Sequence, residues 1–166
     1  MKVQIWDTHN RQKVNAKIEE AKSKEMPLKK DGWQFTWKTL YKTEGSEFYK
    51  LSILNSSNQI EGMLMLSLMY DEMVYMNNIE VAPYNLGTNG RFDNVAGALI
   101  AYGCKKSFEL GKNDYVGYLT FESKTKLIPL YQKRYGAILA IGQRMFINPE
   151  NGIKLIDEYL KYTQDD

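Results

Sequence analysis

Cysteine and histidine are almost absent from this chain of 166 residues, which has one of each, Cys104 and His9. A lone cysteine cannot form an internal disulfide, and this fits a chain that works in a reducing cytosol. One cysteine and one histidine cannot make a usual structural zinc site, and we expect no metal cofactor. A serine triad would have to use His9 as its base. Cys104 falls on the packed face of a predicted helix, which disfavours an acyl-cysteine mechanism.

Long apolar runs and an excess of one charge sign are also missing. No apolar run approaches the roughly 20 residues of a membrane span, and the initial MKVQI has no apolar signal-peptide region. We therefore expect a cytoplasmic protein without a membrane partner. The net charge of +2 gives no sign of an obligate polyanion partner. The length suits one core, so we expect a single domain over residues 1–166.

The N-terminal third has the least regular pattern. Residues 3–6 predict a short edge strand, and residues 9–26 predict a helix because their apolar positions recur at helical spacing. Pro27 ends this helix. Residues 33–42 are ambiguous, because their aromatic residues alternate as in a strand, whereas Thr36 suits the cap of a short helix. We favour the helix.

The rest of the chain alternates more clearly between strand and helix patterns. Strands are predicted over 47–54, 59–69 and 73–81, joined by turns at 55–58 and 71–72 into an antiparallel meander. Later elements are a helix over 94–110, a strand over 115–121, a helix from Ser123 as its cap to Tyr135, strands over 137–141 and 143–147, and a helix from Asn148–Pro149 onward. The order strand, helix, strand implies a right-handed crossover between parallel strands. Residues 163–166 are expected to fray.

A Gly- and Asn-rich turn separates the strand at 73–81 from the long helix. Its core is Arg91-Phe92-Asp93-Asn94-Val95-Ala96. Such a turn at a helix N-terminus suits a phosphate, because backbone N–H groups and the positive end of the helix dipole point at the anion. An ordinary turn that caps a buried helix has the same composition. The turn alone therefore does not decide between the two interpretations.

Three segments in order resemble the GNAT superfamily of acyl-CoA-dependent N-acyltransferases. They are Ile79-Glu80-Val81-Ala82-Pro83, the Arg91 turn, which is similar to the family's R/Q-x-x-G-x-G/A pyrophosphate loop, and Leu130-Tyr131-Gln132-Lys133-Arg134-Tyr135-Gly136-Ala137. The resemblance covers residues 47–146 and departs at Asn94, where the pattern has Gly. It implies an α/β fold (an α+β mixed sheet) in which an antiparallel meander precedes a parallel β-α-β unit with splayed central strands.

The resemblance implies acetyl-CoA as co-substrate. The cofactor-binding residues it implies are Ile79, Val81, Arg91, Asn94, Val95, Ala96, Gly97 and Lys124. Backbone amides of the turn would hold the pyrophosphate, with Arg91 adding charge or anchoring the turn. The pantetheine arm would pair with backbone groups of Ile79 and Val81 between the splayed strands. Asn94 tolerates the left-handed conformation that Gly allows, and it would narrow the phosphate space or donate to the phosphate.

Two residues are candidates for proton transfer. Helical spacing alone favours a core tyrosine at Tyr131. With the family pattern we favour an acid that supplies a proton or hydrogen bond to the departing CoA thiolate. Glu80 would accept the proton of the attacking amine. A solvated strand glutamate or an anchor for a substrate ammonium is the alternative for Glu80.

We therefore predict an acetyl-CoA-dependent N-acetyltransferase that acts on a primary amine by direct attack in a ternary complex. A non-catalytic acyl-CoA-binding or regulatory module on the same fold is the alternative, and a nucleotide-phosphate-binding α/β protein is a more distant one. We expect a small-molecule or peptide acceptor and no nucleic acid, and the chain is compatible with a homodimer. Residues 33–50 mix aromatics with lysines, as single-strand nucleic-acid binders do, but we expect them to form a wall of the acceptor pocket or core.

Overall fold

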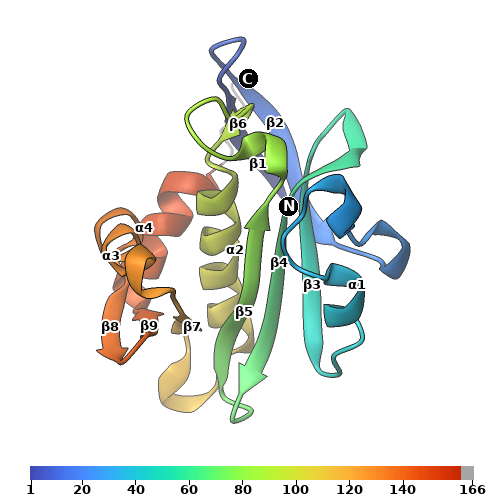
Figure 1. Cartoon of the computed structure of the whole chain (residues 1–166). Helices are drawn as coiled ribbons and strands as arrows, with labels where there is room; N and C mark the ends of the chain where they lie inside the picture. Colours follow the sequence, from blue (N-terminus) through green and yellow to red (C-terminus); the bar gives the residue numbers. More distant parts are fainter. Residues whose placement is uncertain (162–166) are drawn as a thin grey trace.

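A computed structural model describes residues 1–161 of the chain. One mixed sheet dominates it, with the strand order β6-β1-β2-β3-β4-β5-β7-β9-β8 (Figure 1). The strands are β1 (Lys2–Asp7), β2 (Gln12–Glu20), β3 (Ser46–Ile53), β4 (Ser56–Met69), β5 (Met73–Val81), β6 (Phe92–Asp93), β7 (Leu119–Glu122), β8 (Ile138–Ile141) and β9 (Arg144–Ile147). The α-helices are α1 (Trp37–Leu40), α2 (Val95–Leu110), α3 (Ile128–Tyr135) and α4 (Pro149–Tyr159). Short 3-10 turns are η1 (Ser23–Glu25), η2 (Lys29–Asp31), η3 (Pro83–Asn85), η4 (Asn113–Tyr115) and η5 (Thr125–Leu127).

The helix predicted over 9–26 is wrong, because half of this segment, Gln12–Glu20, is strand β2. It pairs antiparallel with β1 and with β3. Ala16 and Ile18 are buried, while their neighbours along the strand are more exposed. The spacing of four from Val14 to Ile18 fits a helix, but the same positions with Ala16 between them also fit the period of two of a strand. Tertiary pairing decides the outcome over a helix-favouring composition.

The meander of β3, β4 and β5 is confirmed, as is the long helix α2 that follows it. The segment around Thr36 forms a single helical turn, α1, without a side-chain cap bond from Thr36. Strand β7 begins four residues later than predicted, at Leu119. Ser123 does not cap a helix, because η5 intervenes and α3 begins at Ile128. The predicted fraying of residues 163–166 lies outside the described residues.

The helices cover the two faces of the sheet unequally. Helices α2, α3 and α4 lie on one side of the sheet and α1 lies on the other (Figure 1). The larger core packs α2 against the sheet, and a smaller core around Trp37 packs α1 against Phe48 and Met63. Gly97 of α2 faces the ring of Tyr159 on α4, where a Cβ atom would overlap the ring. This close approach fixes how α4 lies on α2.

Strands β5 and β7 are parallel neighbours, but they pair over only two residues each. The paired positions are Val74 with Leu119 and Tyr75 with Thr120. On the other side of β5, the register with β4 shifts so that Asn77 has no partner, which marks a β-bulge. On the edge that faces β7, pairing ends at Tyr75, so the rest of that β5 edge has no strand partner. The predicted parallel crossover with splayed strands is confirmed.

None of the helices between residues 1 and 161 is both long and apolar enough to cross a membrane.

Candidate active site

The gap left by β5 and β7 is a cleft of about 360 Å³. Six consecutive residues of β5 line it, from Met76 to Val81. Successive side chains of a strand point to opposite faces of the sheet. Because all six residues line the cleft, it follows the edge of β5 and reaches toward both faces of the sheet. We call this cleft the slot.

At one end the slot reaches the first turn of α2. Leu86, Ala96 and Ile100 line it there. The first N–H groups of a helix have no partner within the helix, and the dipole makes this end positive. This end of the slot can therefore receive an anion.

Asn85 sets the path of the turn that leads into α2. Its side chain accepts from the Phe92 amide at 3.0 Å and donates to the Glu61 carbonyl at 3.2 Å. Gly90 passes so close to the Asn85 backbone that a Cβ atom would overlap it. Beneath the turn, burial raises the pKa of the Glu61 carboxyl against the opposing hydrogen bonds of Asn85 and Tyr84. The turn is thus held from below by a buried polar cluster.

Arg91 holds the same turn from the side. Its guanidinium contacts the Asp7 carboxylate at 3.1 Å and the His9 ring at 3.4 Å. Burial opposes ionisation of Asp7, but hydrogen bonds from Asn10 and Arg91 outweigh it and lower the Asp7 pKa to about 2. Arg91 does not line the slot. Of the two roles considered for Arg91, the geometry favours anchoring of the turn.

Asn94 adopts the left-handed conformation, with φ of 72°, immediately before α2. Its side chain faces a smaller hollow beside β1 rather than the slot. Val95 is buried in the core, and Gly97 faces Tyr159. Ala96 is therefore the one side chain of these four that lines the slot. Any contact of the other three with a ligand in the slot would be made by their backbone.

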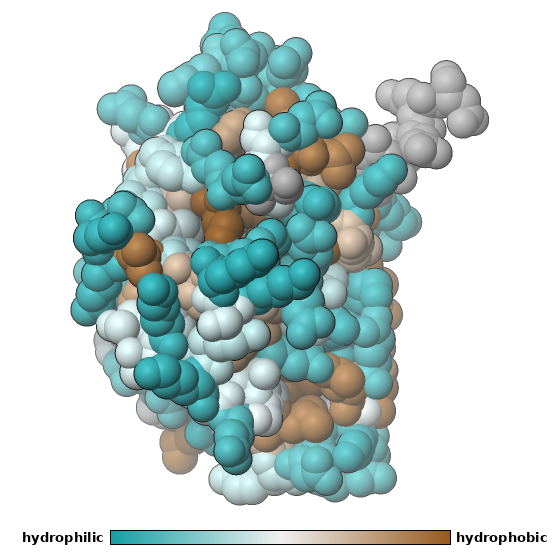
Figure 2. All heavy atoms as spheres, turned by 90° about the vertical axis from the view of Figure 1, so that its right-hand side faces the viewer, coloured by the Kyte–Doolittle hydropathy of each residue, from teal (hydrophilic) through white to brown (hydrophobic). Residues whose placement is uncertain are grey.

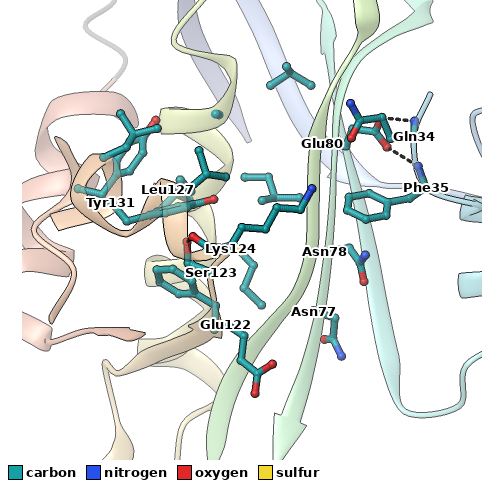
Figure 3. A pocket seen from close by; sticks show the side chains of 18 of the residues that line it. Gln34, Phe35, Asn77, Asn78, Glu80, Glu122, Ser123, Lys124, Leu127 and Tyr131 are labelled. Atoms are coloured by element: carbon teal, nitrogen blue, oxygen red, sulfur yellow. Dashed lines mark hydrogen bonds between the residues drawn. The ribbon is translucent and has the colours of Figure 1, made fainter. Parts of the chain in front are cut away.

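Tyr131 of α3 lines the slot on the side opposite β5 (Figure 3). Its ring packs against Phe121 with a centroid distance of 4.9 Å and against Tyr135 at 5.8 Å. Burial raises the pKa of its hydroxyl. The hydroxyl is thus protonated at neutral pH and can donate a proton or a hydrogen bond.

Glu80 lies in the slot on the side that faces α1. Its carboxylate accepts hydrogen bonds from the amides of Gln34 at 2.6 Å and Phe35 at 3.1 Å (Figure 3). It also accepts one from the Trp37 indole at 2.9 Å. Charge-assisted bonds of this kind are about twice as strong as neutral ones. Glu80 therefore ties the segment before α1 to the middle of the sheet.

Lys124 follows β7 and reaches across the slot toward β5 (Figure 3). Its ammonium forms no salt bridge with a carboxylate of residues 1–161. A free ammonium inside the slot can bind an anionic or carbonyl group of a ligand.

The slot gathers six of the ten residues singled out in the sequence: Ile79, Glu80, Val81, Ala96, Lys124 and Tyr131. It also holds residues that were not singled out individually as site residues: Gln34, Phe35, Asn77, Asn78, Ser123 and Leu127. Gln34 and Phe35 agree with the expectation that their segment forms one wall. Asn77 and Asn78 lie at the β-bulge of β5, and no pattern in the sequence predicts that bulge.

Comparison of the sequence with models of known protein families and with curated proteins finds no match. Solved structures, however, share the fold at low identity. A structure of the KacTA–DNA complex has a TM-score of 0.62 at 13% identity, covering 86% of this chain and 99% of the other. The structure of AtaT complexed with acetyl-methionyl-tRNAfMet has the same TM-score of 0.62 at 13% identity, again covering 86% of this chain and 99% of the other. AtaTR bound with acetyl-CoA has a TM-score of 0.58 at 15% identity, over 85% and 98% of the two chains.

These neighbours overturn the expected set of partners. They include a toxin bound to its antitoxin and complexes with DNA and with tRNA. The expectation of a small-molecule or peptide acceptor without nucleic acid is therefore wrong. Together with the splayed parallel pair and the sheet order, the neighbours establish that this chain has the fold of the GNAT superfamily of acetyltransferases.

Proposed function

We propose that this chain transfers the acetyl group of acetyl-CoA to a primary amine in a ternary complex. The main support for this proposal is the slot, because it offers an unpaired strand edge that leads away from a helix N-terminus and reaches toward both faces of the sheet. Two substrates can then approach the same point from opposite sides. The AtaTR structure with acetyl-CoA, on the same fold, supports this assignment.

In this proposal the pyrophosphate of acetyl-CoA rests on the backbone amides at the start of α2, from Asn94 to Gly97. Ala96 leaves room beside them, since it is the small side chain that lines the slot there. The pantetheine arm would lie along the β5 edge and use backbone groups of Ile79 and Val81. Arg91 contributes by holding the turn against Asp7. Lys124 would meet the cofactor where the arm passes β7.

The chemistry needs one bond to form and one to break. The amine nitrogen attacks the thioester carbonyl carbon, the carbon–sulfur bond breaks, and the thiolate leaves. Tyr131 would give its proton or a hydrogen bond to that sulfur, since burial keeps its hydroxyl protonated. Backbone N–H groups near the bulge at Asn77 could stabilise the oxygen as charge develops. The proton of the amine would pass to water or to Glu80.

We further propose that the acceptor amine is carried by an aminoacyl-tRNA. AtaT has been solved with acetyl-methionyl-tRNAfMet, and that chain is covered over 99% of its length here. An aminoacyl-tRNA presents a primary amine at the end of a single strand, and such an end is narrow enough to enter a slot. A cytoplasmic setting, where acetyl-CoA and tRNA meet, is part of the proposal.

A non-catalytic acyl-CoA-binding module is the second candidate. Glu80, the residue considered as a base, already receives three hydrogen bonds from its own chain. A site without a free base could bind the cofactor without using it. The fold and the slot would be the same in both cases.

Release of free thiol from acetyl-CoA separates these candidates. The assay would use methionyl-tRNA, methionine methyl ester and a panel of simple amines, with mass spectrometry of the acetylated product. We expect thiol release that depends on the acceptor and equals the amide formed. Binding of acetyl-CoA without transfer to any acceptor would support the binding module. Absence of binding would remove both candidates.

A further inference from the structure

We propose that lysines on η2 and α1 form a surface that binds the phosphates of an RNA whose amine-bearing end enters the slot. The lysine surface consists of Lys29, Lys30, Lys38 and Lys42. This inference rests on the proposed function, because it names the part of the chain that holds the acceptor. It is carried by the position, exposure and pairing of these four side chains.

The lysine surface flanks, along the chain, the two residues of this segment that line the slot. Lys29 and Lys30 precede Gln34 and Phe35, which line the slot, and Lys38 and Lys42 follow them. Glu80 fixes the intervening backbone against β5, because it accepts hydrogen bonds from the Gln34 and Phe35 amides (Figure 3) and from the Trp37 indole. The four lysines therefore flank an anchored part of the chain rather than lying on a free tail.

All four lysine side chains are exposed. The face of the molecule that carries α1 is covered mainly by hydrophilic residues (Figure 2). Asp31 is the only acid between residues 28 and 42, and Glu44 and Glu47 are the next acids along the chain. Residues 28–42 thus carry a net positive charge, although the whole chain is nearly neutral.

The lysine surface is also free of ion pairs within the part of the chain that the structure describes. None of its ammonium groups forms a salt bridge there, whereas Lys50, Lys105, Lys112, Lys154 and Lys161 all do. A paired lysine must give up its partner before it binds a phosphate. An unpaired lysine releases only its solvent counterions, which favours binding to a polyanion.

The slot itself selects RNA over duplex DNA. Acetyl transfer requires a primary aliphatic amine, which an aminoacyl ester at an RNA end supplies and an unmodified DNA duplex lacks. A cleft of about 360 Å³ also cannot admit a duplex. Phe35 is only partly buried at the opening, where a terminal base could stack on its ring. Phosphates of the same strand would then lie outside, within reach of the lysines.

The test compares two variants with the same loss of charge. In the first, Lys29, Lys30, Lys38 and Lys42 are all changed to Gln. In the control, Lys13, Lys105, Lys154 and Lys161 are changed to Gln, which removes four positive charges from residues that do not line the slot. Binding of methionyl-tRNA is measured by fluorescence anisotropy over a range of salt. Acetyl transfer is measured with methionyl-tRNA and with methionine methyl ester, which has the amine but no phosphates.

We expect the first variant to bind RNA at least tenfold more weakly and to lose about 2 to 3 units of salt slope, at about 0.7 per single-strand phosphate. Its transfer to the ester should match wild type, and the control variant should retain RNA binding. Equal RNA binding by the two variants would contradict the proposed role of the lysine surface. The proposal would also be wrong if polyglutamate bound more tightly than RNA and its binding depended on these lysines. If wild type acetylated neither acceptor, the proposed function would be refuted. The RNA-binding comparison would still test whether the lysine surface binds RNA.

Discussion

Tyr131 is the residue on which the proposed chemistry depends most. No hydrogen bond joins its hydroxyl to another residue of the described chain, and its ring is held by Phe121 and Tyr135. Removal of the hydroxyl would therefore break no hydrogen bond among residues 1–161. The sequence alone could not separate an acid from a core tyrosine, because helical spacing is the same for both. The position of the side chain in the slot now favours the acid.

We predict that Tyr131→Phe lowers kcat about a hundredfold, which is about 3 kcal/mol of barrier, with little change in acetyl-CoA affinity. An interaction made mainly in the transition state has this effect. The melting temperature should stay close to that of wild type. Tyr135→Phe is the matched control, since Tyr135 lies on the same helix and also lines the slot. A Tyr131→Phe variant with full turnover would leave the enzyme without this acid.

At the scale of elements, the segment before α1 is held to β5 mainly through Glu80. Residues 34–37 and 80 are far apart in the sequence, so no local pattern could reveal their contact. The sequence suggested Glu80 as a base or an ammonium anchor. The three hydrogen bonds favour a different role, in which Glu80 positions the segment that lines one side of the slot.

We predict that Glu80→Gln destabilises the fold by about 2 kcal/mol, because hydrogen bonds to a charged group contribute about 1.5 to 3 kcal/mol each and the amide keeps one acceptor oxygen. Denaturant unfolding measures this loss, and limited proteolysis should cut residues 33–42 sooner than in wild type. Glu122→Gln is the control, since Glu122 also lines the slot but is exposed. Unchanged stability together with a hundredfold lower kcat would assign Glu80 to the base instead.

Over the whole molecule, the sequence predicted the parts whose patterns are local and periodic. The meander, α2 and the parallel crossover follow from alternation, turn residues and the small residues of the helix. The hairpin of β1 and β2 did not, because its helix-favouring composition is overridden by pairing with β3. The turn before α2 was predicted as a phosphate site, but its anchors, Asp7 and Asn85, come from contacts that only the fold creates.

The central claim is that acetyl-CoA binds in the slot with its pyrophosphate at the start of α2. Ala96→Glu tests this claim best, because Ala96 lines the slot, whereas a larger residue at Gly97 would collide with Tyr159 and disturb the fold. A carboxylate beside the pyrophosphate would repel it and would compete for the positive end of the helix. Asn55→Glu adds the same charge in an exposed turn away from the slot and serves as the control.

The measurement is a calorimetric titration of wild type, Ala96→Glu and Asn55→Glu with acetyl-CoA, after circular dichroism has established that all three are folded. We predict that wild type and Asn55→Glu bind alike, and that Ala96→Glu binds at least tenfold more weakly, a difference of about 1.4 kcal/mol or more. Undiminished binding by a folded Ala96→Glu variant, or no binding by wild type, would contradict the claim.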